Sequence, residues 1–363
     1  MEAPLISLKG MARIKPIIVS SSIGLIVLAI VISSLKENSS RATSSPEIND
    51  VREIASSESS KIGTLIKSKK NNLKSPTGDQ LLEDFGFVKP SRDKLENHII
   101  KEGSINSLIA TGIILQDPSY YYRALNIEPN NPHLLLLLGS HENIPPLQKL
   151  EFAEKLIQEQ PENLVGSYLL ASIKINLDQT NEAIATLLNT HNQNDFNDFL
   201  MDSSLAINET LLLLGNSEIG SALYSIFFIQ SPMTYRYNEI SNFLVNEFNE
   251  TQPIETSELR KITAELGTNM VSQKNFLIND LVGLAIQKKS MAGMEQNSPS
   301  PFIGLSVDEA HGNLIKQKNQ IKNLVVPDLK QMNEIDHDTL VEWFRKIREV
   351  GEYQATVWLN NES

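Results

Sequence analysis

The sequence predicts an all-α protein that has a single N-terminal transmembrane helix and then a body of repeated helical hairpins with a C-terminal helical region. Three observations support this prediction. An uninterrupted apolar stretch lies near the N-terminus, apolar residues of the body recur at spacings of three and four, and helices that end in proline return along the body.

The composition is that of a globular protein, and it excludes several kinds of site. The 363 residues are 40% hydrophobic and 21% charged, which is enough for a sizeable core. The chain has no cysteine, which excludes disulfides, thiolate metal ligands and a cysteine nucleophile. The net charge of −12 repels phosphate backbones, so we do not expect nucleic acid as a partner.

The apolar stretch is residues 17–35, which contain no charged side chain. As a helix they would span about 28 Å, close to the hydrocarbon thickness of a bilayer. We therefore expect an uncleaved transmembrane helix, through which the protein contacts the membrane. A cleaved secretory signal and a buried helix of a soluble protein are the alternatives, although a signal needs a shorter apolar stretch followed by small residues.

The basic residues on either side of this segment predict its orientation. Lys9, Arg13 and Lys15 precede it, whereas Lys36 and Arg41 follow it. Since the more basic flank stays in the cytoplasm, residues 1–16 are expected to form a cytoplasmic tail. The body would then lie on the non-cytoplasmic side, in the periplasm or outside the cell.

Residues 36–92 are expected to form a flexible linker rich in serine and lysine. Large apolar side chains are scarce there, so folding would not offset the entropy of ordering the segment. An apolar island from Leu81 to Val88 is the exception, and it suggests a short strand or helix. The rest of the chain divides into a helical repeat domain, 93–250, and a C-terminal helical domain, 251–363.

Helix signals between Asp117 and Pro161 define the repeat. Asp117-Pro118 is a helix start, and Pro129 ends the helix that follows because proline supplies no amide hydrogen. A later helix ends at Pro161, 32 residues further on, and an asparagine-bearing turn follows each proline. Such a period of paired helices is typical of a solenoid, in which each pair buries its apolar face against the next.

The segment 104–232 resembles degenerate tetratricopeptide repeats. In that family, the first helix of a repeat carries Leu-Gly between two aromatic residues, and the second carries Ala, an aromatic residue and a closing Pro. The resemblance implies that the matching residues pack the helices together; they are Tyr121, Ala124, Pro129, Leu138, Gly139, Pro161, Leu170, Ala171, Ala183, Leu187, Gly220, Tyr224 and Pro232. The small residues would let two helices approach, while the larger ones fill the groove beside them.

The match departs from the family pattern at several positions. Leu135 and Ser167 replace the early aromatic residue, and Glu142 and Lys174 replace the later one. No proline closes the unit that contains Leu187.

The C-terminal region is predicted to be helical without clear repeats. Apolar residues keep a helical spacing from Glu258 to Met291, with Gly267 or Gly283 as the candidate break. Two leucine runs of the repeat region, 134–138 and 211–214, are too short to span a bilayer, and we expect both to lie in helices that are buried on all sides.

No arrangement typical of catalysis, of cofactor binding or of metal binding occurs in the sequence. The histidines are scattered, and no phosphate loop or serine elbow is present. In the triplet 336–338, Asp-His-Asp, we interpret Asp336 as a helix N-cap. Asp195, Asp198 and Asp202 are interpreted as the solvated face of a helix. We therefore predict no catalytic residue, no cofactor and no metal site.

These features predict a membrane-anchored protein that holds another protein or a peptide in the groove of its stacked helices, as an adaptor or scaffold without catalysis. One alternative is an enzyme with an unrecognised active site in residues 233–363, which the repeats would target. The other is a structural spacer in a membrane complex. The run 235–237, Tyr-Arg-Tyr, has side chains favoured at binding hot spots, although packing is the interpretation that we favour.

Overall fold

The computed structural model describes residues 82–192, 195–227, 229, 231–248, 253–273 and 275–362, and the regular structure in these ranges is helical. Two isolated β-bridges are the only strand pairing within them. The prediction of an all-α body is therefore confirmed. The tail 1–16, the segment 17–35 and the linker up to residue 81 lie outside the described residues.

No helix in the described ranges is long and apolar enough to cross a membrane. The helix with the leucine run, Pro132–Ser140, has nine residues and would span about 14 Å, half of what a bilayer needs. The longest helix, Pro253–Ser272, has 20 residues but carries several charged side chains. We therefore withdraw the assignment of a single-pass membrane protein with a cytoplasmic tail and a non-cytoplasmic body, which the structure does not support.

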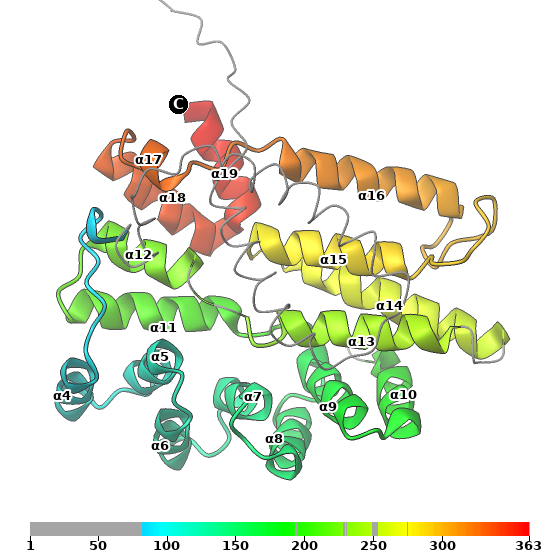
Figure 1. Ribbon diagram of the computed structural model, residues 1–363, viewed down its shortest axis with the longest axis horizontal. Coiled ribbons are helices and arrows are strands. Elements are labelled where there is room, and N and C mark those ends of the chain that lie inside the picture. The colour runs from blue at the N-terminus through cyan, green and yellow to red at the C-terminus, as the bar shows by residue number, and fades with distance from the viewer. Residues whose placement is uncertain are drawn as a thin grey trace, which may run out of the picture.

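The chain from Arg92 to Leu188 forms a row of helices, which are seen nearly end-on along the lower edge of Figure 1. In chain order these are α4 (Arg92–Glu102), α5 (Ile105–Leu115), α6 (Ser119–Ile127), α7 (Pro132–Ser140), α8 (Pro146–Glu159), α9 (Leu164–Asn176) and α10 (Thr180–Leu188). Helix α5 packs against α6, α7 against α8, and α9 against α10, so the row is built from hairpins. A 3-10 turn, η3 (Asn189–Asn192), follows α10.

Capping side chains explain where several of these helices begin. The side chains of Ser91, Ser104, Asn131 and Asn163 accept backbone hydrogen bonds at the starts of α4, α5, α7 and α9. They satisfy amides that have no partner within the helix. All of the leucine run 134–138 in α7 is buried, as predicted.

Two further helices, α11 (Leu200–Leu213) and α13 (Thr234–Glu247), lie crosswise over this row in Figure 1. Helix α11 packs on α5, and α13 packs on α9, while α12 (Glu218–Phe227) folds back on α11. Leu212 and Leu213 are 39% and 65% exposed, so the prediction that the run 211–214 is buried on all sides is wrong. The reason is that α11 packs on α5, α12 and α7, while Leu212 and Leu213 lie on the helix face that also exposes Leu205.

The remaining helices are α14 (Pro253–Ser272), α15 (Leu277–Lys289), α16 (Val307–Lys322), α17 (Leu329–Met332), α18 (His337–Val350) and α19 (Glu352–Glu362). The break predicted between residues 258 and 291 falls between α14 and α15, at neither glycine. Gly267 and Gly283 instead mark where these two helices touch, because a Cβ on Gly267 would lie 2.5 Å from the carbonyl oxygen of Gly283.

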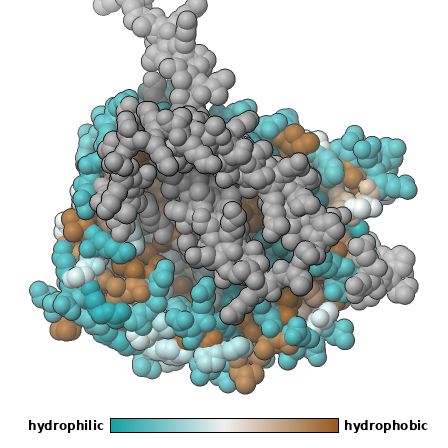
Figure 2. Space-filling model, viewed as in Figure 1, coloured by the Kyte–Doolittle hydropathy of each residue, from teal (hydrophilic) through white to brown (hydrophobic). Residues whose placement is uncertain are grey.

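Two large apolar clusters form most of the core, and each takes residues from both sides of residue 250. One joins α5 and α11 to Trp343 of α18. The other joins α9 and α13 to Leu266 of α14. The division of the chain at residue 250 stays a prediction. Figure 2 shows polar residues over much of the described surface on this face, with apolar residues scattered among them.

Candidate functional site

The face of the hairpins that meets α11 and α13 is closed by the chain itself. Every residue of α7 from His133 to Ser140 is buried. The ring of His133 forms a hydrogen bond of 2.8 Å with the hydroxyl of Ser203 on α11, and it stacks on the ring of Phe199 at 5.4 Å. A partner therefore cannot reach this side of α7 without displacing α11.

Arg236 of α13 fastens the other crossing helix to the row. Its guanidinium donates hydrogen bonds of 2.9 Å to the carbonyl oxygen of Ser140 on α7 and to the hydroxyl of Ser172 on α9. That hydroxyl in turn donates to the carboxylate of Glu239, at 2.8 Å. Burial lowers the pKa of Arg236, while the charge of Glu239 raises it. The role that this geometry supports is packing, because the guanidinium ties three helices together.

The residues that the repeat resemblance singled out lie mainly in helix interiors. Those that are buried are Tyr121, Ala124, Leu138, Gly139, Leu170, Ala171, Ala183, Leu187 and Gly220. Pro129 and Pro161 lie exposed just after α6 and α8, whereas Pro232 lies just before α13 rather than after a helix. The tetratricopeptide assignment itself stays a prediction.

Two of these residues contact a segment that the repeat pattern did not include. Phe87, in the chain before α4, stacks its ring on Tyr224 with the centroids 4.6 Å apart. A Cβ on Gly220 would lie 2.8 Å from the backbone nitrogen of Phe87 and 2.9 Å from the carbonyl oxygen of Phe85. The apolar island before α4 therefore packs on α12, as a single helical turn.

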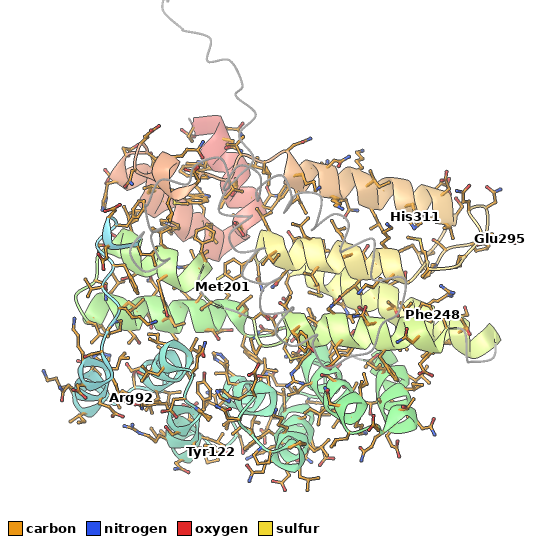
Figure 3. All side chains as sticks on the ribbon, in the orientation of Figure 1. Arg92, Tyr122, Met201, Phe248, Glu295 and His311 are labelled. Carbon is orange, nitrogen blue, oxygen red and sulfur yellow. The ribbon has the colours of Figure 1, made fainter. Side chains whose placement is uncertain are left out.

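The opposite side of the row is open along α6 and α8, whose main helix contacts are with their neighbours in the row, whereas α10 also contacts α14. The hydroxyl of Tyr122 donates to the amide oxygen of Gln148 at 3.2 Å, which links α6 to α8. The ammonium of Lys155 donates to the carbonyl oxygen of Pro129 at 2.6 Å. Ile127 at the end of α6 and Leu147 at the start of α8 are 56% and 71% exposed. Figure 3 places Tyr122 at the lower edge of the molecule.

A pair of buried carboxyl groups joins the C-terminal hairpin to α15. The carboxylate of Glu352 accepts a hydrogen bond of 2.9 Å from the backbone nitrogen of Leu277 at the start of α15. Burial raises the pKa of Glu352 to about 7, and burial with the charge of Glu352 raises the pKa of Asp280 to about 7 as well. One carboxylate oxygen of Asp280 is buried without a hydrogen-bond partner. Both side chains are only 7% exposed, so no substrate reaches them in this conformation.

Of the predictions made for acidic residues, the one for Asp336 is confirmed and the one for Asp198 is wrong. Asp336 caps α18 by accepting from the backbone nitrogen of Thr339 at 3.0 Å, as predicted. Asp198 lies before α11 begins and is 2% exposed, so the interpretation of a solvated helix face is wrong there. Its carboxylate accepts from the backbone nitrogen of Leu200 and the hydroxyl of Ser231, and burial raises its pKa to about 6.

Within the part of the chain that the structure describes, no group of three or more metal-ligating side chains comes together. No protein-family model matches the sequence, and neither a curated protein nor a solved structure shows significant similarity to it. The candidate site is therefore defined by surface geometry alone, and it is the open side of the hairpin row.

Proposed function

We propose that this chain is a helical-repeat protein that binds another protein or a peptide as an adaptor or scaffold and has no catalytic activity of its own. The observation that carries the proposal is the row of hairpins, which is braced on one side by α11 and α13 and open along α6 and α8. Stacked helices of this kind present an extended and rigid surface, which suits protein partners. The resemblance to tetratricopeptide repeats supports the same function.

The structure changes where the contact is expected. The sequence suggested binding in the groove of the stacked helices. However, the hydrogen bond of His133 holds α11 against α7, and those of Arg236 hold α13 against α7 and α9. The open helices are α6 and α8. We therefore propose that Ile127 and Leu147 contribute to the binding surface, since exposed aliphatic side chains gain most from being covered.

An enzyme with its site in residues 233–363 is the second candidate, and one observation favours it. The Asp280 and Glu352 carboxyl groups converge there, with pKa values raised to about 7 as in many catalytic sites. Their burial and the hydrogen bond of Glu352 to Leu277 fit a structural contact better. Asp280→Asn would abolish activity in an enzyme, whereas it should leave partner binding unchanged.

The proposal is tested by recovery of partners with the tagged full-length chain, followed by quantitative mass spectrometry. A specific partner should be recovered with the parent protein and reduced in Ile127→Asp/Leu147→Asp. The matched control is Ile303→Asp, in the loop before α16, where the side chain is fully exposed at 101%. If no protein is enriched over a tag-only control, the adaptor function is wrong.

A further inference from the structure

A cationic helix face stands out on this acidic protein. The chain carries a net charge of −12, and α16 has Asp308 and Glu309 in its first turn, but residues 310–327 contain three lysines and no aspartate or glutamate. Most of these residues belong to α16, which lies along the outer edge of the molecule in Figures 1 and 3. A local excess of one charge on a surface of the opposite sign needs an explanation.

Helix α16 uses only one side to pack on the body. Val307, Ala310 and Leu314 are buried against α15 and the loop before α16. The adjacent face of α16 carries His311, Ile315, Lys318 and Lys322. Their spacings of four, three and four place them in one line along the helix. Ile315 is 60% exposed within this line.

The neighbouring helix α15, which packs on α16, carries a further lysine whose charge acts on this line. The pKa of Lys318 is lowered by burial and then by the charges of Lys322 and of Lys288, which lies near the end of α15. None of the three ammonium groups forms a hydrogen bond or an ion pair with a described residue. The stripe of α16 together with Lys288, the α16 lysine face, is therefore a group of like charges that the described chain does not neutralise.

We propose that the α16 lysine face docks an acidic segment of the protein partner, with carboxylates opposite the lysines and an aliphatic contact to Ile315. This inference rests on the proposed adaptor function and names the chemistry of one contact. Complementary charge at the rim of an interface steers the partner and fixes its register. Like-charged lysines that are close together gain from a shared counter-charge, because it also removes their mutual repulsion.

An acidic protein segment fits better than the other polyanions. Nucleic acid would bring its phosphates close to a chain of net charge −12 through three lysines without an interleaved aromatic side chain. A membrane surface would need more than one exposed aliphatic side chain on this face to hold the helix in the interface. Both alternatives are included as arms of the test.

The test uses the full chain and a fluorescein-labelled oligoglutamate peptide, with binding followed by fluorescence anisotropy at low ionic strength. Lys318→Glu/Lys322→Glu should weaken binding about tenfold, because two exposed ion pairs are replaced by repulsion. The matched control, Lys94→Glu/Lys101→Glu on α4, reverses two exposed lysines elsewhere. It should change the affinity less than twofold.

Equal weakening in both variants would show non-specific attraction and would overturn the proposal, as would no effect in the α16 variant. An oligothymidylate or a phosphatidylserine vesicle that binds more tightly and responds to the α16 variant would also overturn it. The adaptor function is judged separately, by partner recovery. If a partner is recovered while oligoglutamate binds the parent and both variants alike, only the docking proposal fails.

Discussion

The contact between Gly267 and Gly283 offers a sharp test of how α14 and α15 pack. In Gly267→Ala, the new Cβ would lie 2.5 Å from the carbonyl oxygen of Gly283 and 2.8 Å from the backbone nitrogen of Gln287. Ordinary van der Waals contact begins at 3.4 Å. Both neighbours are backbone atoms and cannot rotate away, so the two helices must separate.

Overpacking of this kind costs about 1–3 kcal/mol. Replacing a helical glycine by alanine also stabilises the helix by about 1 kcal/mol through helix propensity. The control variant must have the same gain, so that it cancels when the two variants are compared. Gly312 in α16 provides the control, because a Cβ there would meet no atom within 4 Å. Gly312→Ala should therefore be slightly more stable than the parent, by up to about 1 kcal/mol.

The difference between the two variants isolates the packing term, since both gain the same propensity. We expect Gly267→Ala to unfold at a lower urea concentration than Gly312→Ala, with a difference of about 1–3 kcal/mol in unfolding free energy. Far-UV circular dichroism measures the two midpoints. Equal midpoints would refute the close approach of α14 and α15.

Three further predictions concern buried polar groups. Since the fold raises the pKa of Asp280 to about 7, the native state holds more protons than the unfolded chain between about pH 4 and 7. Stability therefore falls as pH rises through that window, and Asp280→Asn should be more stable than the parent by roughly 1–3 kcal/mol at pH 8 in urea unfolding. For His133, burial lowers the pKa to about 4, so stability should fall as pH drops from 6.5 towards 4, by up to about 3 kcal/mol. In His133→Phe, the melting temperature should depend less on pH between 6.5 and 4 than in the parent. An unchanged pH dependence would show that His133 does not cause this loss of stability. Arg236→Met leaves the carbonyl of Ser140 without its donor and should cost about 2–4 kcal/mol. If Arg236→Met has the same melting temperature as the parent, the Arg236 hydrogen bonds do not stabilise the packing of α13 on α7 and α9.

The local part of this fold could be predicted from the sequence. Residues 134–138 are apolar on all sides, and Asn131 and Asn163 have the side chains that cap helices, so the positions of α7 and α9 follow from neighbouring residues. The same holds for Asp336 at the start of α18. Each of these signals involves residues within one or two helical turns.

The membrane prediction shows the limit of a composition signal. Residues 17–35 are apolar enough for a transmembrane helix, but they lie outside the described residues, and no helix within the described part of the chain could span a bilayer. An apolar stretch indicates that burial is favourable, but it does not indicate whether a bilayer or other helices of the protein cover it. The leucines of α7 illustrate this, because neighbouring helices cover them.

The sequence by itself determined the helical class, the helix ends near Pro129 and Pro161 and the absence of cysteine chemistry, because these depend on local spacing and composition. Only the tertiary structure decided that α11 and α13 close one side of the row and that Gly267 meets Gly283. It also brought Glu352 to Leu277. The physical reason is that each of these contacts joins different helices, and the apolar period of one helix shows that a face is buried without identifying the segment that covers it.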